Sequence, residues 1–127
     1  LRDPGLRRIA LANPRLAPYG RAALEVAEAL GMGDILRGRQ VIGMNVSQAH
    51  QFVRTGNAEL GFLALSQVAR TSDGSRWVVP EDLHAPIRQQ AVLLDAGRDN
   101  PAARRFLDFL DSGAAREILR RHGYRSE

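Results

Sequence analysis

Apolar residues near the start of the chain form one short continuous run and then a helical stripe. The segment "RRIALAN", residues 7–13, is apolar between arginines and Asn-Pro, which is typical of a short buried strand. Over residues 19–30 the apolar positions recur at helical spacing, and Gly31 is placed to end that helix. The loop between them holds two prolines, more than a tight connection from strand to helix needs. This predicts a strand, a loop of unusual composition and an amphipathic helix.

The middle of the chain repeats this arrangement. "MGDILRGR", residues 32–39, predicts a loop or a single turn, and "QVIGMN", residues 40–45, predicts a second short strand. Asn45 is a candidate N-cap, with Gln48 in capping-box position, for a helix over residues 46–55. "LGFLALSQV", residues 60–68, is apolar on both faces, which predicts a central strand covered on both sides and favours a parallel sheet.

The rest of the chain predicts two more strands and two helices. "RWVVP" at 76–80 and "QAVLLDAG" at 90–97 are typical of strands, with a crossing loop, residues 81–89, between them. Asn100 is placed to cap the first terminal helix, and Gly123 to end the second. The order of elements predicts an α/β fold, a layered sheet with helices on both faces.

Composition and charge narrow the function classes. The 127 residues suffice for one domain with a buried core, and no apolar run approaches the roughly 18 residues of a membrane helix. All 18 basic residues are arginine, but they are scattered among acids, which argues against a nucleic-acid partner. Cysteine is absent, which excludes thiolate metal sites and cysteine nucleophiles.

The remaining chemistry-bearing residues do not suggest an enzyme. Histidines 50, 84 and 122 lie far apart without an acid partner at ligand spacing, so packing explains them better than metal binding. Ser47 and Ser66 have no evident base, and "GMGDILRG" lacks the spacing of a phosphate-binding loop. We therefore predict a protein without catalytic residues.

Two helix starts are the strongest candidates for a site. In a parallel sheet the loops at 17–20 and 45–47 lie at the carboxyl edge of the strands, where ligands usually bind. Free N–H groups and the helix dipole attract anions there. Pro18 has no N–H, so Tyr19 is the first donor of one helix, and Asn45 as cap leaves the Val46 N–H of the other pointing outward. The pair predicts an anion site, although each start alone also fits an ordinary capped helix.

Four blocks of the sequence resemble a known family. "ANPRLAPYGRAALEVAEALG", "NVSQAHQFVRTGNAELGFLALSQV", "PIRQQAVLLDAGRDNPAARRFLDFL" and "AREILRRHGY" are similar to the periplasmic molybdate-binding protein of bacterial ABC importers. That family has the two-lobed type II periplasmic-binding-protein fold. The resemblance covers nearly the whole chain and implies a non-enzymatic, periplasmic binding protein.

The resemblance also implies a ligand and its contacts. Molybdate or tungstate would be held by neutral donors, with Tyr19 and Val46 as oxyanion contacts and no other metal site or resident cofactor. Asn45, Ser47 and Gly20 would support these contacts. Some relatives use a tyrosine at the place of Ala64, and here Tyr19 takes that part. The implied partners are the small oxyanion and the membrane permease of an ABC transporter, and no nucleic acid.

The same resemblance predicts a domain arrangement. Residues 1–80 would form lobe two, and residues 81–127 the returning strand and C-terminal helices of lobe one, whose N-terminal part is absent. The returning part would then expose apolar surface and favour self-association. An alternative is the effector-binding domain of a transcription regulator that binds a small organic anion. A winged helix-turn-helix encoded upstream of Leu1 would decide for that alternative.

Overall fold

The sheet of the computed structural model, which describes residues 1–125, has three strands. β1 (Ile9–Ala12) lies in the middle, with β2 (Gln40–Gly43) on one side and β3 (Leu60–Gly61) on the other. Both pairings are parallel. All four residues of β1 are buried. The predicted parallel sheet is therefore confirmed.

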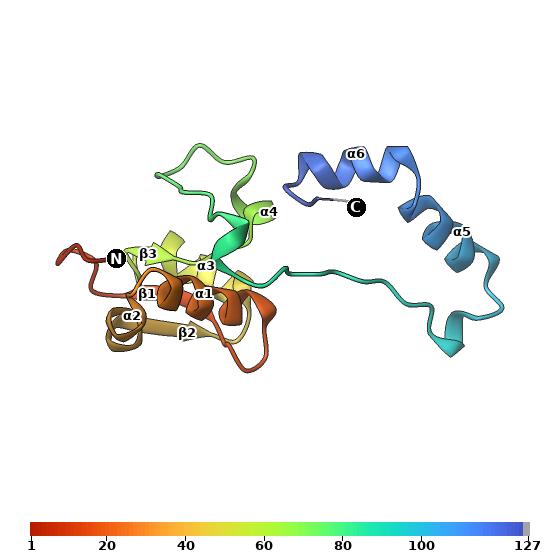
Figure 1. The fold of residues 1–127 in the computed structure, drawn as a ribbon. Coiled ribbons are helices and arrows are strands. Elements are labelled where there is room, and N and C mark those ends of the chain that lie inside the picture. Colours follow the sequence, from red (N-terminus) through yellow and green to blue (C-terminus); the bar gives the residue numbers. More distant parts are fainter. Residues whose placement is uncertain (126–127) are drawn as a thin grey trace. The chain divides into compact units, whose positions relative to one another are not determined.

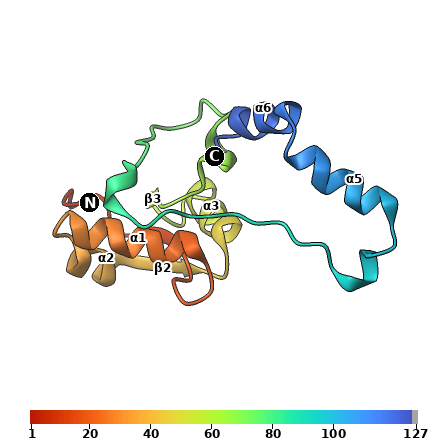
Figure 2. The ribbon, with the colours of Figure 1, turned by 45° about the vertical axis from the view of Figure 1, so that its right-hand side comes forward.

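Helices cover both faces of this sheet, as predicted (Figure 1 and Figure 2). Ile9 and Leu11 point to one face and form a core cluster with α1 (Pro18–Ala29) and α2 (Gly33–Arg39). Ala10, between them in the strand, packs on the opposite face with α3 (Val46–Arg54). Alternation of side chains along β1 thus supplies both cores, because a strand presents successive residues to opposite faces.

Residues 33–39 form a helix, and the prediction of a loop or single turn there is wrong. The α1 helix ends at a Schellman turn, in which the N–H of Met32 donates to the Ala27 carbonyl at 2.7 Å. The chain then enters α2, where Leu36 is completely buried in the core. Arg37 pairs with Glu28, which fastens α2 to α1, and with Asp34 within α2 itself. One apolar anchor and these ion pairs stabilise a helix that is too short to show a clear stripe.

The prediction of a central strand over residues 60–68 is also wrong. β3 covers only Leu60–Gly61 and lies beside β1 rather than at the centre. Phe62 still donates its N–H to the Ala10 carbonyl at 2.8 Å, after which the chain turns into α4 (Leu65–Val68). The run is apolar because Leu60 and Phe62 pack against the core under α1 and α2, whereas Leu63 packs against the core under α3, and not because it forms one long strand.

A second unit of the fold begins near the end of the predicted crossing loop. The chain divides between Ile87 and Arg88, following a 3₁₀ turn at Glu81–Leu83. The second unit holds another 3₁₀ turn, Asp95–Gly97, and the two predicted terminal helices, α5 (Pro101–Leu110) and α6 (Gly113–Arg121). The assignment of the two units to lobes stays a prediction.

The helix ends of the second unit agree with the sequence. The Asn100 side chain accepts the N–H of Ala102 at 2.9 Å, so its predicted role as N-cap is confirmed. Tyr124 returns its N–H to the Leu119 carbonyl at 3.0 Å, after Gly123 in the left-handed region. The local signals of these helices were therefore sufficient to place them.

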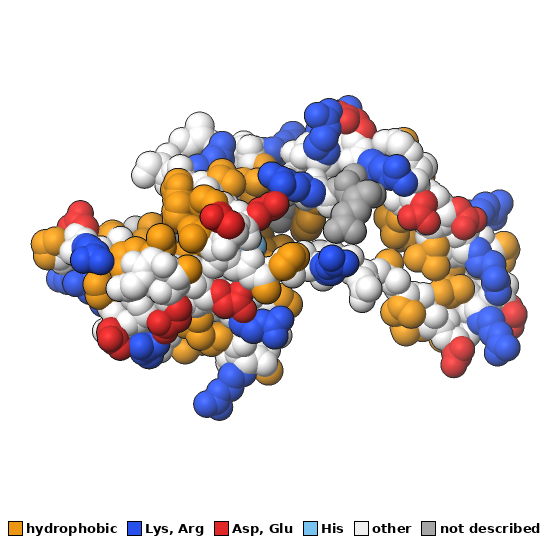
Figure 3. Space-filling view, viewed as in Figure 1, with side chains coloured by type: hydrophobic (Ala, Val, Ile, Leu, Met, Phe, Trp, Pro, Cys, Tyr) orange, Lys and Arg blue, Asp and Glu red, His pale blue; other side chains and the backbone are white. Residues whose placement is uncertain are grey.

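The predicted strands at 76–80 and 90–97 are wrong, since no strand forms there among the described residues. Extended apolar segments become strands only when a neighbour accepts their hydrogen bonds. Apolar surface is exposed instead, and hydrophobic side chains are visible around α5 in Figure 3. The exposed apolar residues of these segments and helices include Trp77, Val78, Val92, Leu94, Phe106, Phe109 and Ile118.

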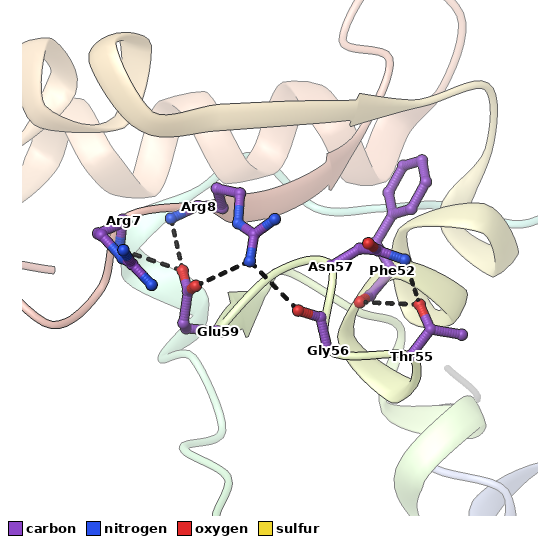
Figure 4. A network of polar contacts seen from close by, with 7 residues as sticks. All are labelled: Arg7, Arg8, Phe52, Thr55, Gly56, Asn57 and Glu59. Atoms are coloured by element: carbon purple, nitrogen blue, oxygen red, sulfur yellow. Dashed lines mark hydrogen bonds and ion pairs between the residues drawn. The ribbon is translucent and has the colours of Figure 1, made fainter.

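A polar network fastens the start of β1 to the turn after α3 (Figure 4). One oxygen of Glu59 accepts the N–H groups of Arg7 and Arg8, at 3.1 and 2.6 Å. The guanidinium of Arg8 donates to the other oxygen at 3.2 Å and to the Gly56 carbonyl at 3.3 Å. The N–H and the guanidinium of Arg8 lower the pKa of Glu59, the N–H contributing most. The network holds β3 in register beside β1.

Within residues 1–125, no helix combines the length and the apolar character that a membrane-spanning segment needs.

Candidate anion site at the carboxyl edge of the sheet

The loop after β1 is built around Asn13. Its N–H donates to the Gly43 carbonyl at 2.7 Å, which ties the end of β1 to the end of β2. Its side-chain oxygen accepts the N–H of Arg15 at 2.9 Å, and its carbonyl accepts those of Leu16 and Ala17. The loop therefore folds back over its own first residue, and α1 begins at Pro18 close to the end of the strand.

Gly20 sets how closely α1 approaches β1. A Cβ at this position would lie 2.1 Å from the carbonyl oxygen of Ala12, a backbone atom that has little room to move. Gly20 is buried, so the first turn of α1 rests directly on the last residue of the strand. Gly20 thus has a packing role, and its support of the oxyanion contacts stays a prediction. Tyr19, half-buried and second in the helix, is positioned by this contact just beyond the end of β1.

Gly43 plays the same part at the second helix. A Cβ there would lie 2.9 Å from the N of Ala49 and 3.1 Å from the carbonyl oxygen of Asn45. The first turn of α3 consequently rests on the end of β2, although less closely than α1 rests on β1. Gly43 was not among the predicted site residues, although its place two residues before a capping asparagine is a signal present in the sequence.

In the first turn of α3, some backbone N–H groups have hydrogen-bond acceptors within the described residues, and the N–H of Val46 has none. The Asn45 side chain accepts the N–H of Gln48 at 2.9 Å, which confirms Asn45 as the N-cap. The Gln48 side chain reaches back to the N–H of Met44 at 2.6 Å, one residue beyond its capping-box partner. Among the hydrogen bonds of residues 1–125, none is donated by the N–H of Val46. This half-buried first residue of α3 thus retains a donor.

The charge around the two helix starts suits an anion. The first turns of α1 and α3 contain no acidic residue, so nothing opposes the positive ends of the helix dipoles. Arg15 and Arg21 line a shallow cavity of about 170 Å³ outside the loop after β1. In the described part of the chain no polar or charged side chain is buried. The Val46 N–H, rather than a buried counter-charge, is therefore the donor available at the end of β2.

Ser47 lies on the outward side of α3. It lines an open groove of about 450 Å³, together with His50 and Arg54. Its hydroxyl oxygen accepts from the side-chain N of Gln67 in α4, at 3.3 Å. Ser47 therefore links two helix starts, a contact that the sequence analysis missed. Gln67 occupies the third position of a short helix, where a glutamine is a common capping residue.

The histidines take part in local contacts. His84 Nδ1 lies 2.8 Å from the Ala85 carbonyl, and His122 Nδ1 lies 2.9 Å from the Ile118 carbonyl. Residues 1–125 contain no cluster of three or more histidine, cysteine or acidic side chains that could hold a metal ion.

The structure brings the two predicted helix starts to one edge of the sheet. α1 begins after β1 and covers one face, whereas α3 begins after the adjacent β2 and covers the other. Between neighbouring parallel strands whose helices diverge to opposite faces, a crevice opens outside the strand ends. That Tyr19 and Val46 contact one ligand in this crevice stays a prediction.

Comparison with known proteins places this architecture among binding proteins. Residues 1–125 match the sequence model of a family described as bacterial extracellular solute-binding protein. The molybdate-binding protein ModA of Azotobacter vinelandii is 47% identical over 127 residues, which cover 98% of this chain and 50% of that protein. ModA of Rhodobacter capsulatus is 48% identical over 122 residues, covering 96% and 48%.

A solved structure shows the same fold. The periplasmic molybdate-binding protein of Azotobacter vinelandii matches with a TM-score of 0.90 at 35% identity, over 98% of this chain and 56% of that one. The chain thus spans about half the length of the relatives it matches. The family consists of solute-binding proteins rather than enzymes, and its extracellular description agrees with the periplasmic location that the resemblance implies. These relatives favour the solute-binding hypothesis over a transcription regulator.

Proposed function

The chain belongs to the bacterial extracellular solute-binding protein family, and from this premise we propose that it forms one side of a molybdate or tungstate site. The N–H groups of Tyr19 and Val46 donate to oxygens of the bound oxyanion, and the Tyr19 phenol supplies a further donor. The observation that carries this proposal is the pair of adjacent strand ends, each pressed by a glycine against a helix start.

Neutral donors suit this ligand. A tetrahedral dianion without protons can only accept hydrogen bonds, and helix N-termini offer N–H groups that need no accompanying charge. The Val46 N–H is not used by the described part of the chain, and no acidic residue stands in either first turn. The relatives named molybdate-binding are nearly half identical to this chain over the segment that carries both helices.

This chain supplies only part of the site in our proposal. Two helix starts cannot surround a tetrahedral ion, and the relatives are about twice as long as the chain. The other donors come from outside these residues, and the complete protein delivers its anion to the membrane permease of an ABC transporter. Molybdate and sulfate carry the same charge, so selection between them depends on cavity size and donor placement.

Calorimetry tests the choice of anion. The protein at its natural length is titrated with molybdate, tungstate and sulfate, and we expect the first two to bind much more tightly than the third. Equal affinity for all three would refute the molybdate assignment. Robust binding of an organic anion with none of these three would favour the regulator-type effector site instead.

A proline substitution tests the amide of Val46. Val46→Pro removes the N–H at the first helical position, where proline fits, and Asn45 before it already has the extended conformation that proline requires. We expect molybdate affinity to fall roughly 10- to 100-fold, the effect of one hydrogen bond to a charged group. Val46→Ala keeps the N–H and is the matched control. Equal affinity of the two variants would exclude the amide as a contact.

A further inference from the structure

A side-chain amide connects the loops that follow β2 and β3. Gln67 in α4 donates its side-chain N–H to the Ser47 hydroxyl oxygen at 3.3 Å. The side-chain oxygen of the same residue accepts the N–H of Ala64 at 3.4 Å. Ala64 is buried at the start of α4, so this end of the bridge is anchored in the first unit. One side chain therefore spans from the N-cap residue of α4 to the second residue of α3.

The bridge acts on a turn that is otherwise held from one side. Gly43 and Ala49 fix the first turn of α3 on its sheet-facing side, where the backbone atoms are in close contact. On the outward side Ser47 and Asn45 are exposed to solvent. From the neighbouring α4, Gln67 donates a side-chain hydrogen bond to the outward side of this turn. Its loss would free the outward side of the turn while leaving the sheet contact in place.

We infer that Gln67 is a positioning residue, which holds the first turn of α3 so that the Val46 N–H meets the anion at a fixed place. This role rests on the proposed function and adds to it a residue that does not contact the ligand. Donor placement decides which oxyanion fits, and groups that contact a ligand need supporting hydrogen bonds to keep their geometry. Gln67 thus contributes to selectivity through Ser47 rather than through its own contact with the ligand.

Variants on both ends of the bridge test this inference. Gln67→Leu removes the donor and the acceptor at similar size, and Ser47→Ala removes the hydroxyl. We expect each to weaken molybdate binding about three- to tenfold, the range of one neutral hydrogen bond. The double variant should be no weaker than either single one, because both remove the same bond. Ser47→Thr keeps the hydroxyl and should restore affinity.

The matched control is Gln51→Leu, which changes an exposed glutamine on the same helix. Gln51→Leu should change neither the molybdate affinity nor the NMR chemical shifts of the Val46 and Ser47 amides. We expect Gln67→Leu to change both. If Gln67→Leu lowers only the unfolding midpoint while molybdate affinity stays at the wild-type value, the positioning role is overturned and the proposed function stands. If the wild-type protein binds no tetrahedral oxyanion, the proposed function fails and the positioning role with it.

Discussion

The two units of this chain use the same kind of amphipathic helix in opposite ways. In residues 1–87 the helices pack on a sheet, and β1 between them is completely buried. In residues 88–125 the helices α5 and α6 have apolar stripes just as clear, yet Ala115 is the buried residue of that stretch. Phe106 is 59% exposed and Ile118 49% exposed.

This difference shows what a sheet contributes to stability. Local signals such as caps and spacing suffice to form helices in both units, but tertiary packing supplies most of the stability of a helix in a protein. A helix whose stripe meets no partner retains its shape with little to hold it. The first unit is therefore the part of the chain that is rigid enough to hold hydrogen-bond donors at fixed positions in a binding site.

The largest effect we expect is from Leu11→Ala in β1. Leu11 is completely buried, so its truncation leaves a cavity and should lower the free energy of unfolding of the first unit by about 2–5 kcal/mol. Phe106→Ala removes a larger side chain from α5, but one that is mostly exposed, and should cost less than about 1 kcal/mol. Urea unfolding, with hydrogen exchange to assign each loss to its unit, measures both.

Equal losses in these two variants would break the comparison. They would mean that the stripe of α5 is covered in solution by a surface that the described residues do not provide. Self-association, which the sequence analysis predicted for this part, would then be visible as a dependence of the Phe106→Ala effect on protein concentration.

The second prediction compares the effect of adding a Cβ at one glycine of each unit, Gly20 and Gly113. In Gly20→Ala the new Cβ would meet the Ala12 carbonyl oxygen, so α1 must shift, at a cost of about 1–3 kcal/mol and with weaker molybdate binding. Gly113 opens α6 and has no atom within 4 Å of an added Cβ. Gly113→Ala should therefore stabilise its helix by up to about 1 kcal/mol. Denaturant midpoints and calorimetric titration report the two effects, and a Gly20→Ala protein with normal stability and affinity would contradict them.

The sequence predicted those parts of the fold that local chemistry determines. The Asn45 and Asn100 caps and the buried strand at 9–12 are confirmed, because each depends on residues near it in the chain. The strands expected at 76–80 and 90–97 are not formed, since pairing depends on a distant neighbour that composition does not reveal.

The candidate site divides in the same way. Tyr19 and Val46 could be singled out from the strand, loop and helix order, which places helix starts at one edge of a parallel sheet. The closeness of that packing, set by Gly20 and Gly43, required coordinates, because a glycine in a sequence does not say which atom it must avoid. The Gln67 bridge to Ser47 joins residues 20 apart and has no local signature.

The smallest effect we expect is a difference in the pH dependence of stability between two carboxylates, Glu59 and Glu117, whose pKa values are both lowered. Glu59 owes its lowered pKa mainly to the Arg8 N–H, across 51 residues of sequence, and Glu117 owes its own to the side chains of Arg120 and Arg121 within α6. A lowered folded-state pKa gives stability that is present above the unfolded pKa, about 4.3, and is lost as the pH falls through the folded value. Protonation of Glu59 in acid should therefore destabilise the first unit. Protonation of Glu117 should destabilise only the C-terminal end of α6.

Charge-removing variants test this pH dependence. Glu59→Gln should unfold at lower urea than wild type near neutral pH, and the two proteins should converge in acid, where the wild-type carboxylate is protonated. Glu117→Gln should leave the urea midpoint of the first unit unchanged at every pH and reduce only the helix content of α6. Because long-range contacts hold the first unit together and local contacts shape the second, an equal shift of that midpoint by both variants would show that the units unfold as one.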